Sequence, residues 1–338
     1  MKFEARFGFE CSNFKLQTSN FKLQTSMRAY HDFRLFYNQN IHPELLNLEQ
    51  RRRRLVRLLG LSVVLLAGVL LLQLFIGIFL ITLLLLVPVG LWIAYLVFRV
   101  QVYYQEFKPR VVGLILDFID NDVNFSSLKY VAKGSVSKAK FLSSKIFTHA
   151  DEYLAEDYIS GQVREMPFEL CELQVREFSH VRTRLDYVFR GVFLVGDFRR
   201  PDMRGGVLLL PDEYRKYLSR SERAFHVLGG RRQRNNLLPE FEAFFDTYAT
   251  PNVRLQDVLS EELQQGILKF RQHFQESNRE KEIYLSIVND KVYIALTQDK
   301  DLLEPSIFQN TVSFEMVQEF YYDIGMLLNI LLEMDVMN

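Results

Sequence analysis

The dominant feature of the hydrophobic pattern is one long apolar run early in the chain. From Leu58 to Phe98, 41 consecutive residues lack Asp, Glu, Lys, Arg and His. As one α-helix the run would be about 62 Å long at 1.5 Å per residue, whereas one bilayer crossing takes about 20 residues. Because lipid offers no partner to free backbone groups, we predict two transmembrane helices, at about 55–76 and 78–98, with a reversal near Gly77. One long tilted span and a buried core hairpin are the competing interpretations.

Basic residues flank this run on both sides. Arg51–Arg54 and Arg57 precede it, and Arg99, Lys108 and Arg110 follow it. Positive side chains stay on the cytoplasmic side of a membrane. We therefore expect both termini to be cytoplasmic, with only a short turn reaching the other face of the bilayer.

The first 26 residues contain a perfect tandem repeat. The heptapeptide NFKLQTS occupies residues 13–19 and again 20–26, directly before Met27. Two copies are too few for a coiled coil. We interpret residues 1–26 as translated ahead of a true start at Met27, or as a disordered polar tail. Residues 27–54 are expected to be a cytoplasmic segment, with a short amphipathic helix from Tyr30 to Arg54 that breaks near Pro43.

After the run, the pattern predicts one cytoplasmic α+β domain at residues 99–338. Apolar positions between Phe107 and Phe118 recur at helical spacing, so this helix should continue from the second span. Strands are predicted at 157–163, 168–178, 188–198 and 207–210, a hairpin at 283–288 and 292–296, and helices at 255–274 and 314–331. The strands cluster instead of alternating with helices, which favours a mostly antiparallel sheet with packed helices.

Four segments of this domain carry a family resemblance. The segment Phe189–Phe198 reads FRGVFLVGDF and is apolar on both faces, which predicts a central strand. It is followed by GVLLLPD at 206–212, PEFEAFFDTY at 239–248, and the hairpin region 285–305. In this order they resemble a bacterial membrane protein family, the domain-of-unknown-function family 3137.

The resemblance covers about residues 100–330, and the paired spans match as well. It implies an uncharacterised two-span protein of the bacterial inner membrane, with no established activity to carry over. Thr250-Pro251-Asn252 departs from the turn expected after the third segment.

Charge and cysteine content narrow the function further. Lys plus Arg and Asp plus Glu both number 41, but residues 1–54 carry ten basic and five acidic side chains, and residues 99–338 carry 30 and 36. A net acidic domain is not a nucleic-acid binder. Two cysteines, Cys11 and Cys171, exclude a disulfide scaffold or a cysteine-ligated metal cluster. Cys171 lies in an alternating strand and is expected to be buried and inert.

Motifs for catalysis are absent from the sequence. It contains no phosphate-binding loop, no nucleophile elbow and no dinucleotide fingerprint. The nearest candidate is His149 with the carboxylates that follow it, from Asp151 to Asp157. These could form a metal or acid–base site, but we interpret them as a solvated acidic turn. No cofactor and no metal is expected.

A basic stretch between the central strands and the third segment is the only predicted contact surface. Its members are Arg215, Lys216, Arg220, Arg223, Arg231, Arg232 and Arg234. Beside the cytoplasmic leaflet these side chains could rest on anionic lipid headgroups, each charge being worth about 1 kcal/mol. The alternatives are a solvated loop and contact with an acidic protein or nucleotide. The stretch is expected to project from the sheet.

Together these patterns predict a membrane-anchored cytoplasmic scaffold or interaction domain. Its partners would be the lipid bilayer and an unidentified protein, and it would not be an enzyme. Two alternatives stay open. A membrane-bound enzyme with an unrecognised site would show a deep pocket holding carboxylates or a histidine. A channel or transporter subunit would need polar groups in the spans, which are almost without them.

Overall fold

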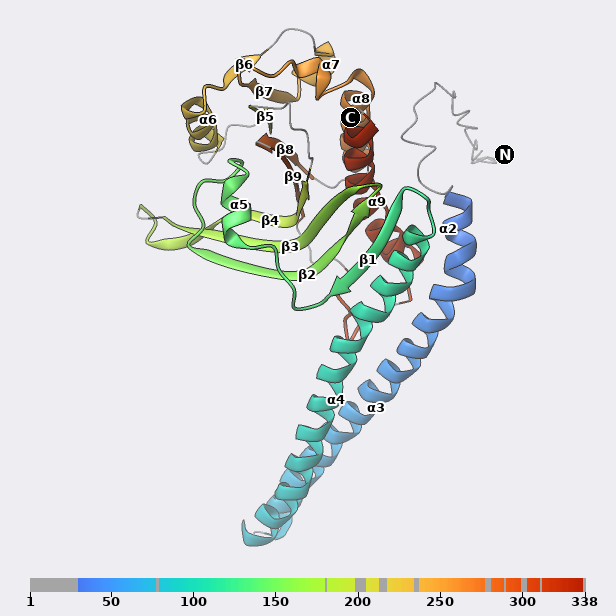
Figure 1. Cartoon of the computed structure of the whole chain (residues 1–338). Coiled ribbons are helices and arrows are strands. Elements are labelled where there is room, and N and C mark those ends of the chain that lie inside the picture. Colours follow the sequence, from blue (N-terminus) through green and yellow to red (C-terminus); the bar gives the residue numbers. More distant parts are fainter. Residues whose placement is uncertain are drawn as a thin grey trace, which may run out of the picture.

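The computed structural model describes residues 30–76, 79–179, 181–197, 205–212, 218–233, 237–276, 281–288, 290–298, 303–310 and 312–336. Two long helices, α3 (His42–Ile76) and α4 (Phe79–Asp120), run side by side and project from an α+β domain (Figure 1). The domain is built on one antiparallel sheet with packed helices. This confirms the predicted fold class.

Both helices of the hairpin are long and apolar enough to cross a membrane. Residues 55–76 of α3 span about 33 Å and residues 79–98 of α4 about 30 Å, close to the hydrocarbon thickness of about 30 Å. Only 11% and 6% of their most apolar stretches are buried by the rest of the described chain. Core helices of a soluble protein would be mostly covered, and these are not.

The chain enters α3 through a continuous helical path. Helix α2 (Tyr30–Phe36) is followed by a π-helical turn, η1 (Tyr37–Ile41), and then by α3. The predicted break at Pro43 is therefore wrong. Proline clashes with the carbonyl four residues back in a regular α-helix. That carbonyl belongs to Gln39, and the wider π turn around it absorbs the conflict without ending the helix.

Among the described residues, the sheet has nine strands in the order β1-β2-β3-β4-β9-β8-β5-β7-β6, and all their pairings are antiparallel. Their bounds are β1 (Phe125–Val131), β2 (Glu152–Val163), β3 (Met166–Ser179), β4 (Arg184–Asp197), β5 (Gly206–Pro211), β6 (Arg231–Gln233), β7 (Phe245–Ala249), β8 (Ile283–Val288) and β9 (Lys291–Thr297). Strand β4 lies inside the sheet between β3 and β9, and β8 pairs with β9 as a hairpin, both as predicted.

Alternate residues of the inner strands enter two separate cores. In β4, Val192 and Leu194 belong to one core, while Phe193 and Val195 belong to the other. The first core is covered by α2, α4, α7 (Pro239–Glu242), α8 (Glu261–Glu276) and α9 (Phe314–Val336). The second is covered by α5 (Lys138–Ser143) and α6 (Leu218–Val227). A sheet covered on both faces explains why these strands are apolar throughout.

Helix α8 begins later than predicted. A short 3₁₀ turn, η2 (Leu255–Asp257), precedes it. The Ser260 hydroxyl then accepts a hydrogen bond from the Leu263 N–H at 3.2 Å. Ser260 therefore caps the N-terminus of the helix.

The segment before the hairpin is part of the first core. Phe33 of α2 stacks on Tyr321 of α9, with ring centroids 3.9 Å apart, and meets the edge of Phe118 at 5.3 Å. Tyr37 and Ile41 of the π turn are also buried. The N-terminal segment is therefore part of the domain core, where Phe33 packs between α4 and α9.

Candidate functional site at the base of the helical hairpin

Lys108 on α4 forms the main polar clamp between the hairpin and the sheet. Its Nζ donates to Asp157 Oδ2 on β2 at 2.5 Å and lies 2.6 Å from Glu304 Oε1. Tyr130 on β1 donates its hydroxyl to Asp157 Oδ1 at 2.5 Å. These contacts join one helix, two strands and the segment that follows β9.

The clamp holds its two proton donors in their protonated forms. Burial alone would lower the pKa of Lys108, but attraction and hydrogen bonds from Asp157 and Glu304 outweigh it, so the pKa lies above its ordinary value. Burial, followed by the hydrogen bond to Asp157, raises the pKa of Tyr130. General acid–base groups have pKa values near the working pH. Both shifts run away from neutrality, so this cluster is suited to holding structure.

A second polar contact ties α3 to the same segment. Arg52 is 8% exposed and donates to Glu49 at 2.8 and 2.7 Å and to the Ile307 carbonyl at 2.6 Å. The Ile307 N–H donates to the hydroxyl of Tyr104 on α4 at 3.2 Å. Both helices of the hairpin are therefore fastened to residues 303–310.

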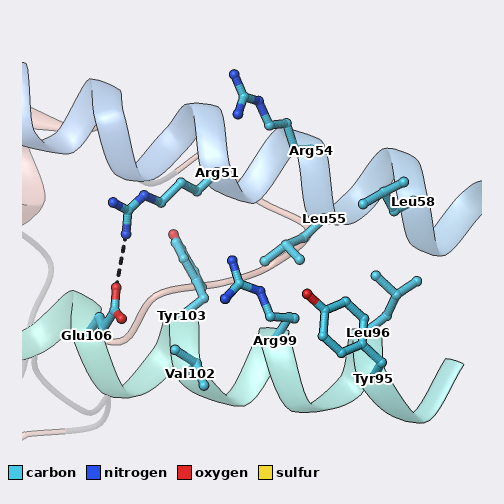
Figure 2. Close-up of a pocket in the computed structure, with 10 residues that line it drawn as sticks. All are labelled: Arg51, Arg54, Leu55, Leu58, Tyr95, Leu96, Arg99, Val102, Tyr103 and Glu106. Carbon is cyan, nitrogen blue, oxygen red and sulfur yellow. Dashed lines mark hydrogen bonds and ion pairs between the residues drawn. The ribbon is translucent and has the colours of Figure 1, made fainter. Parts of the chain in front are cut away.

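Beside this clamp a groove of about 530 Å³ lies between α3 and α4 (Figure 2). Its charged lining residues are Arg51, Arg54, Arg99 and Glu106. Arg51 donates to Glu106 Oε2 at 3.0 Å, and Arg110 approaches the same oxygen at 3.7 Å. In the part of the chain that the structure describes, no carboxylate pairs with Arg54 or Arg99. Three arginines and one glutamate of the described chain line the groove, so it carries an excess of positive charge.

Aromatic and apolar side chains complete the groove. Figure 2 shows Tyr95, Arg99 and Tyr103 extending from α4 into the gap between the helices, while Arg54 extends outward from α3. Leu58 and Leu96 line the part nearer the apolar end of the hairpin. The groove is therefore basic at one end and apolar at the other.

The sequence analysis did not predict that arginines of α3 and α4 line one groove. The arginines that flank the apolar run served there only to predict topology. In an antiparallel hairpin, residues equally far from the reversal lie opposite one another, and the reversal was placed near Gly77. That rule brings Arg51 to Tyr103 and Leu55 to Arg99, as the lining of the groove shows. Hairpin register was thus the signal that could have found the groove.

The basic stretch lies elsewhere in the fold. Arg220 and Arg223 are on α6, Arg231 and Arg232 are on β6, and Arg215, Lys216 and Arg234 lie outside the described residues. Strand β6 is at the opposite edge of the sheet from β1, which packs on α4. Figure 1 shows α6 and β6 at the end of the domain away from the hairpin.

The basic stretch is also partly folded into the domain. Phe225 of α6 is buried in the second core, so the expectation of a loop that projects from the sheet is wrong for this helix. Arg220 donates to both oxygens of Glu177, at 2.6 and 2.5 Å, and Arg232 forms an ion pair with Asp246. Two of the predicted charges are therefore compensated within the protein. Contact of this stretch with lipid stays a prediction.

Removing the Arg220 charge should change the acid dependence of stability. The hydrogen bond from Arg220 outweighs burial and holds the pKa of Glu177 below its ordinary value of 4.5. The pair therefore stabilises the fold above pH of about 4.5 and loses this contribution as pH falls through the folded-state pKa. We expect Arg220→Gln to lower the free energy of unfolding at pH 7 by about 0.2–1 kcal/mol, because the pair is partly solvated.

Urea unfolding of the detergent-solubilised protein at pH 7 and at acidic pH checks this. The difference between Arg220→Gln and the unchanged protein should shrink as pH falls. Arg231→Gln, at an exposed position of β6, is the matched control and should show no such convergence. Identical pH profiles for the two variants would refute the role given to Glu177.

Three of the carboxylates that follow His149 have separate partners. Asp151 accepts a backbone N–H of β3 at 2.7 Å, Glu152 pairs with Arg176 at 3.0 Å, and Asp157 belongs to the Lys108 clamp. Within the described residues, no three His, Cys, Asp or Glu side chains gather as metal ligands would. The acidic turn that we expected is instead the start of β2, with its charges distributed along the strand.

Cys171 is confirmed as a buried side chain. It is a free thiol in the second core, and its exposed fraction is 0%. Burial raises its pKa to about 12. At neutral pH the thiolate, which is the reactive form, is therefore almost absent.

The fold and the base of the hairpin together define a class: an α+β domain on an antiparallel sheet, carried by a two-helix apolar hairpin. Residues 187–336 match the model of a family described as a protein of unknown function (DUF3137). The match runs from β4 to α9 and contains all four segments whose resemblance to this family was predicted, so the resemblance is confirmed there. No curated protein and no solved structure matches the chain.

Proposed function

We propose that this protein is a non-catalytic scaffold anchored in the bacterial inner membrane by α3 and α4, with its α+β domain and both termini on the cytoplasmic side. The observation that carries the proposal is the continuity of α4. This one helix of 42 residues begins in the exposed apolar hairpin and ends inside the core of the domain.

The apolar surface of the hairpin supports the membrane anchor. Leu74, Phe75, Leu80 and Leu84 are each at least 75% exposed. Soluble monomers rarely expose continuous apolar patches larger than a few hundred Å². Arginines border the apolar residues at the end nearer the domain, which favours a cytoplasmic position for the domain.

Rigid attachment supports a scaffold over a domain on a flexible tether. Phe107, Val111 and Ile115 of α4 are fully buried in the first core, about 2.5 to 5 helical turns beyond Phe98, where the apolar run ends. Lys108 and Arg52 add polar contacts to β2 and to residues 303–310. The sheet is therefore held at a fixed height and angle to the membrane. This suits a domain that binds a partner at a defined distance from the bilayer.

Reporter fusions to the full chain test the anchor. Fusions after Asn338 and beside Arg34 should both give cytoplasmic signals, and the protein should stay in the membrane pellet after alkaline carbonate extraction. An external signal at either position would overturn the proposed topology. Release by carbonate would overturn the anchor itself.

Recovery of a bound protein partner tests the scaffold proposal. After cross-linking in intact cells and purification in mild detergent, one protein partner should be recovered in fixed stoichiometry at native expression levels. Recovery of the chain alone, with and without cross-linking, would contradict a scaffold.

A further inference from the structure

We propose that the groove between α3 and α4 binds an anionic phospholipid, with its headgroup phosphate on Arg99 inside the groove and with Arg54 at the outer rim. This rests on the proposed membrane hairpin and adds a specific ligand to it. The site is separate from the basic stretch on α6 and β6, which lies at the other end of the domain (Figure 1).

The charge of the groove favours an anionic ligand. Glu106 is the one carboxylate that the described residues bring to the groove, and it is already shared between Arg51 and Arg110. Arg54 and Arg99 have no carboxylate partner among the described residues. Figure 2 shows the Arg99 guanidinium between the two helices, beside Tyr95 and Tyr103. A guanidinium binds two phosphate oxygens at once, and a tyrosine hydroxyl can donate a further hydrogen bond.

The depth of the two arginines favours a lipid headgroup. Arg54 lies just before the uncharged apolar run that spans Leu58–Phe98, and Arg99 directly follows this run. If the hairpin spans the bilayer, both guanidinium groups lie at the level of the lipid phosphates. Trp92 and Tyr95, with ring centroids 5.9 Å apart, lie just below them, where amphipathic rings favour the interface.

Shape selects a lipid over a free phosphate. The groove continues from the arginines toward Leu58 and Leu96, which give it an apolar wall. A soluble phosphate has no group to place against these leucines. A phospholipid held by its phosphate lays the first part of its acyl chain there. The positive excess also disfavours a zwitterionic headgroup, whose ammonium group would be repelled.

Trp92 offers a direct probe because it is the only tryptophan in the chain. It lies about 10 Å from Arg99 along α4, at 1.5 Å per residue. The full chain would be reconstituted in vesicles of phosphatidylcholine containing brominated phosphatidylglycerol or, in parallel, brominated phosphatidylcholine. Bromine on the acyl chains quenches Trp92 on contact. We expect stronger quenching by the anionic lipid at equal bromine content, and a smaller difference as salt rises.

Variants assign the preference to the groove. With each arginine worth about fivefold in affinity, Arg99→Gln should lower the preference for phosphatidylglycerol about fivefold, and Arg54→Gln with Arg99→Gln about 25-fold. The matched control replaces Arg223 and Arg231, two arginines at the far end of the domain, and should keep the preference. Loss of preference in this control, or its survival in Arg54→Gln/Arg99→Gln, would overturn the proposal.

Three further results separate the remaining possibilities. Glycerol 3-phosphate in the buffer should not abolish the preference, and if it does, the ligand is a soluble phosphate and the lipid assignment is wrong. Equal quenching by both brominated lipids would overturn the headgroup site and leave the anchor intact. No quenching by either lipid would overturn both the site and the membrane hairpin.

Discussion

Replacing Val64 and Val87 with aspartate is expected to keep the hairpin out of the membrane. Both side chains are exposed, at 68% and 58%, and lie near the middle of the apolar parts of α3 and α4. An aspartate at the centre of a transmembrane helix costs about 2.5–3.5 kcal/mol, so the double variant should lose about 5–7 kcal/mol of insertion free energy. The carbonate-resistant fraction of the full chain measures this.

The same substitutions would be almost neutral if the hairpin stood in water. Exposed positions of soluble proteins usually change stability by less than about 0.5 kcal/mol. Val123→Asp is the matched control, since Val123 is 97% exposed in the turn after α4. It should leave the carbonate-resistant fraction unchanged. A double variant that stays in the membrane as well as this control does would count against the anchor.

Gly191→Ala is expected to be the most damaging single change in the domain. Gly191 on β4 has a φ of +145°, and an added Cβ would lie 2.1 Å from the Leu296 carbonyl of β9. A side chain there must push two paired strands apart and adopt a strained backbone. Strain of this kind and overpacking each cost about 1–3 kcal/mol, which gives a loss of about 2–6 kcal/mol in the free energy of unfolding.

Urea unfolding in detergent measures this loss, with Gly113→Ala as the matched control. Gly113 lies inside α4 and has nothing within 4 Å of an added Cβ, so the control should be stabilised by about 0.5–1 kcal/mol. If Gly191→Ala is no less stable than this control, the close approach of Gly191 on β4 to β9 is wrong.

The segment around Gly191 could be recognised from the sequence, but the reason for its glycines comes only from the structure. The segment from Phe189 to Phe198 was predicted as a central strand because it is apolar on both faces, and β4 is inside the sheet. Its glycines carry a packing requirement: an added Cβ on Gly196 would lie 2.8 Å from Val292 of β9. The need for glycine depends on a strand almost 100 residues later, so it cannot be predicted from the neighbouring residues in the sequence.

The elements that were missed have weak local patterns. Strand β1 buries Phe125 while most of its other side chains are exposed, which is typical of an edge strand and gives no clear alternation. Strand β6 has only three residues. The helix continues through Pro43, although proline usually ends a helix. The π turn before it makes this possible, and no sequence pattern predicted that turn.

The candidate site was hidden for a different reason. Lys108, Asp157 and Glu304 come from α4, β2 and the segment after β9, so only the folded sheet brings them together. The groove depends on the register of two antiparallel helices. Charge counting along the chain favoured the denser cluster between Arg215 and Arg234, where Arg220 and Arg232 form ion pairs within the domain.

The most direct test of the membrane anchor is cysteine labelling of the hairpin in spheroplasts with a membrane-impermeant maleimide. Only Cys11 needs replacing, because Cys171 is buried and its raised pKa keeps it unreactive. Single cysteines would be placed at Leu74, near the reversal, at Val64 in the span, and at Lys133 in the domain. We predict labelling of Leu74→Cys from outside, of Lys133→Cys only after lysis, and of Val64→Cys in neither case. Labelling of Lys133→Cys from outside, or ready labelling of Val64→Cys after lysis, would contradict a membrane hairpin with a cytoplasmic domain.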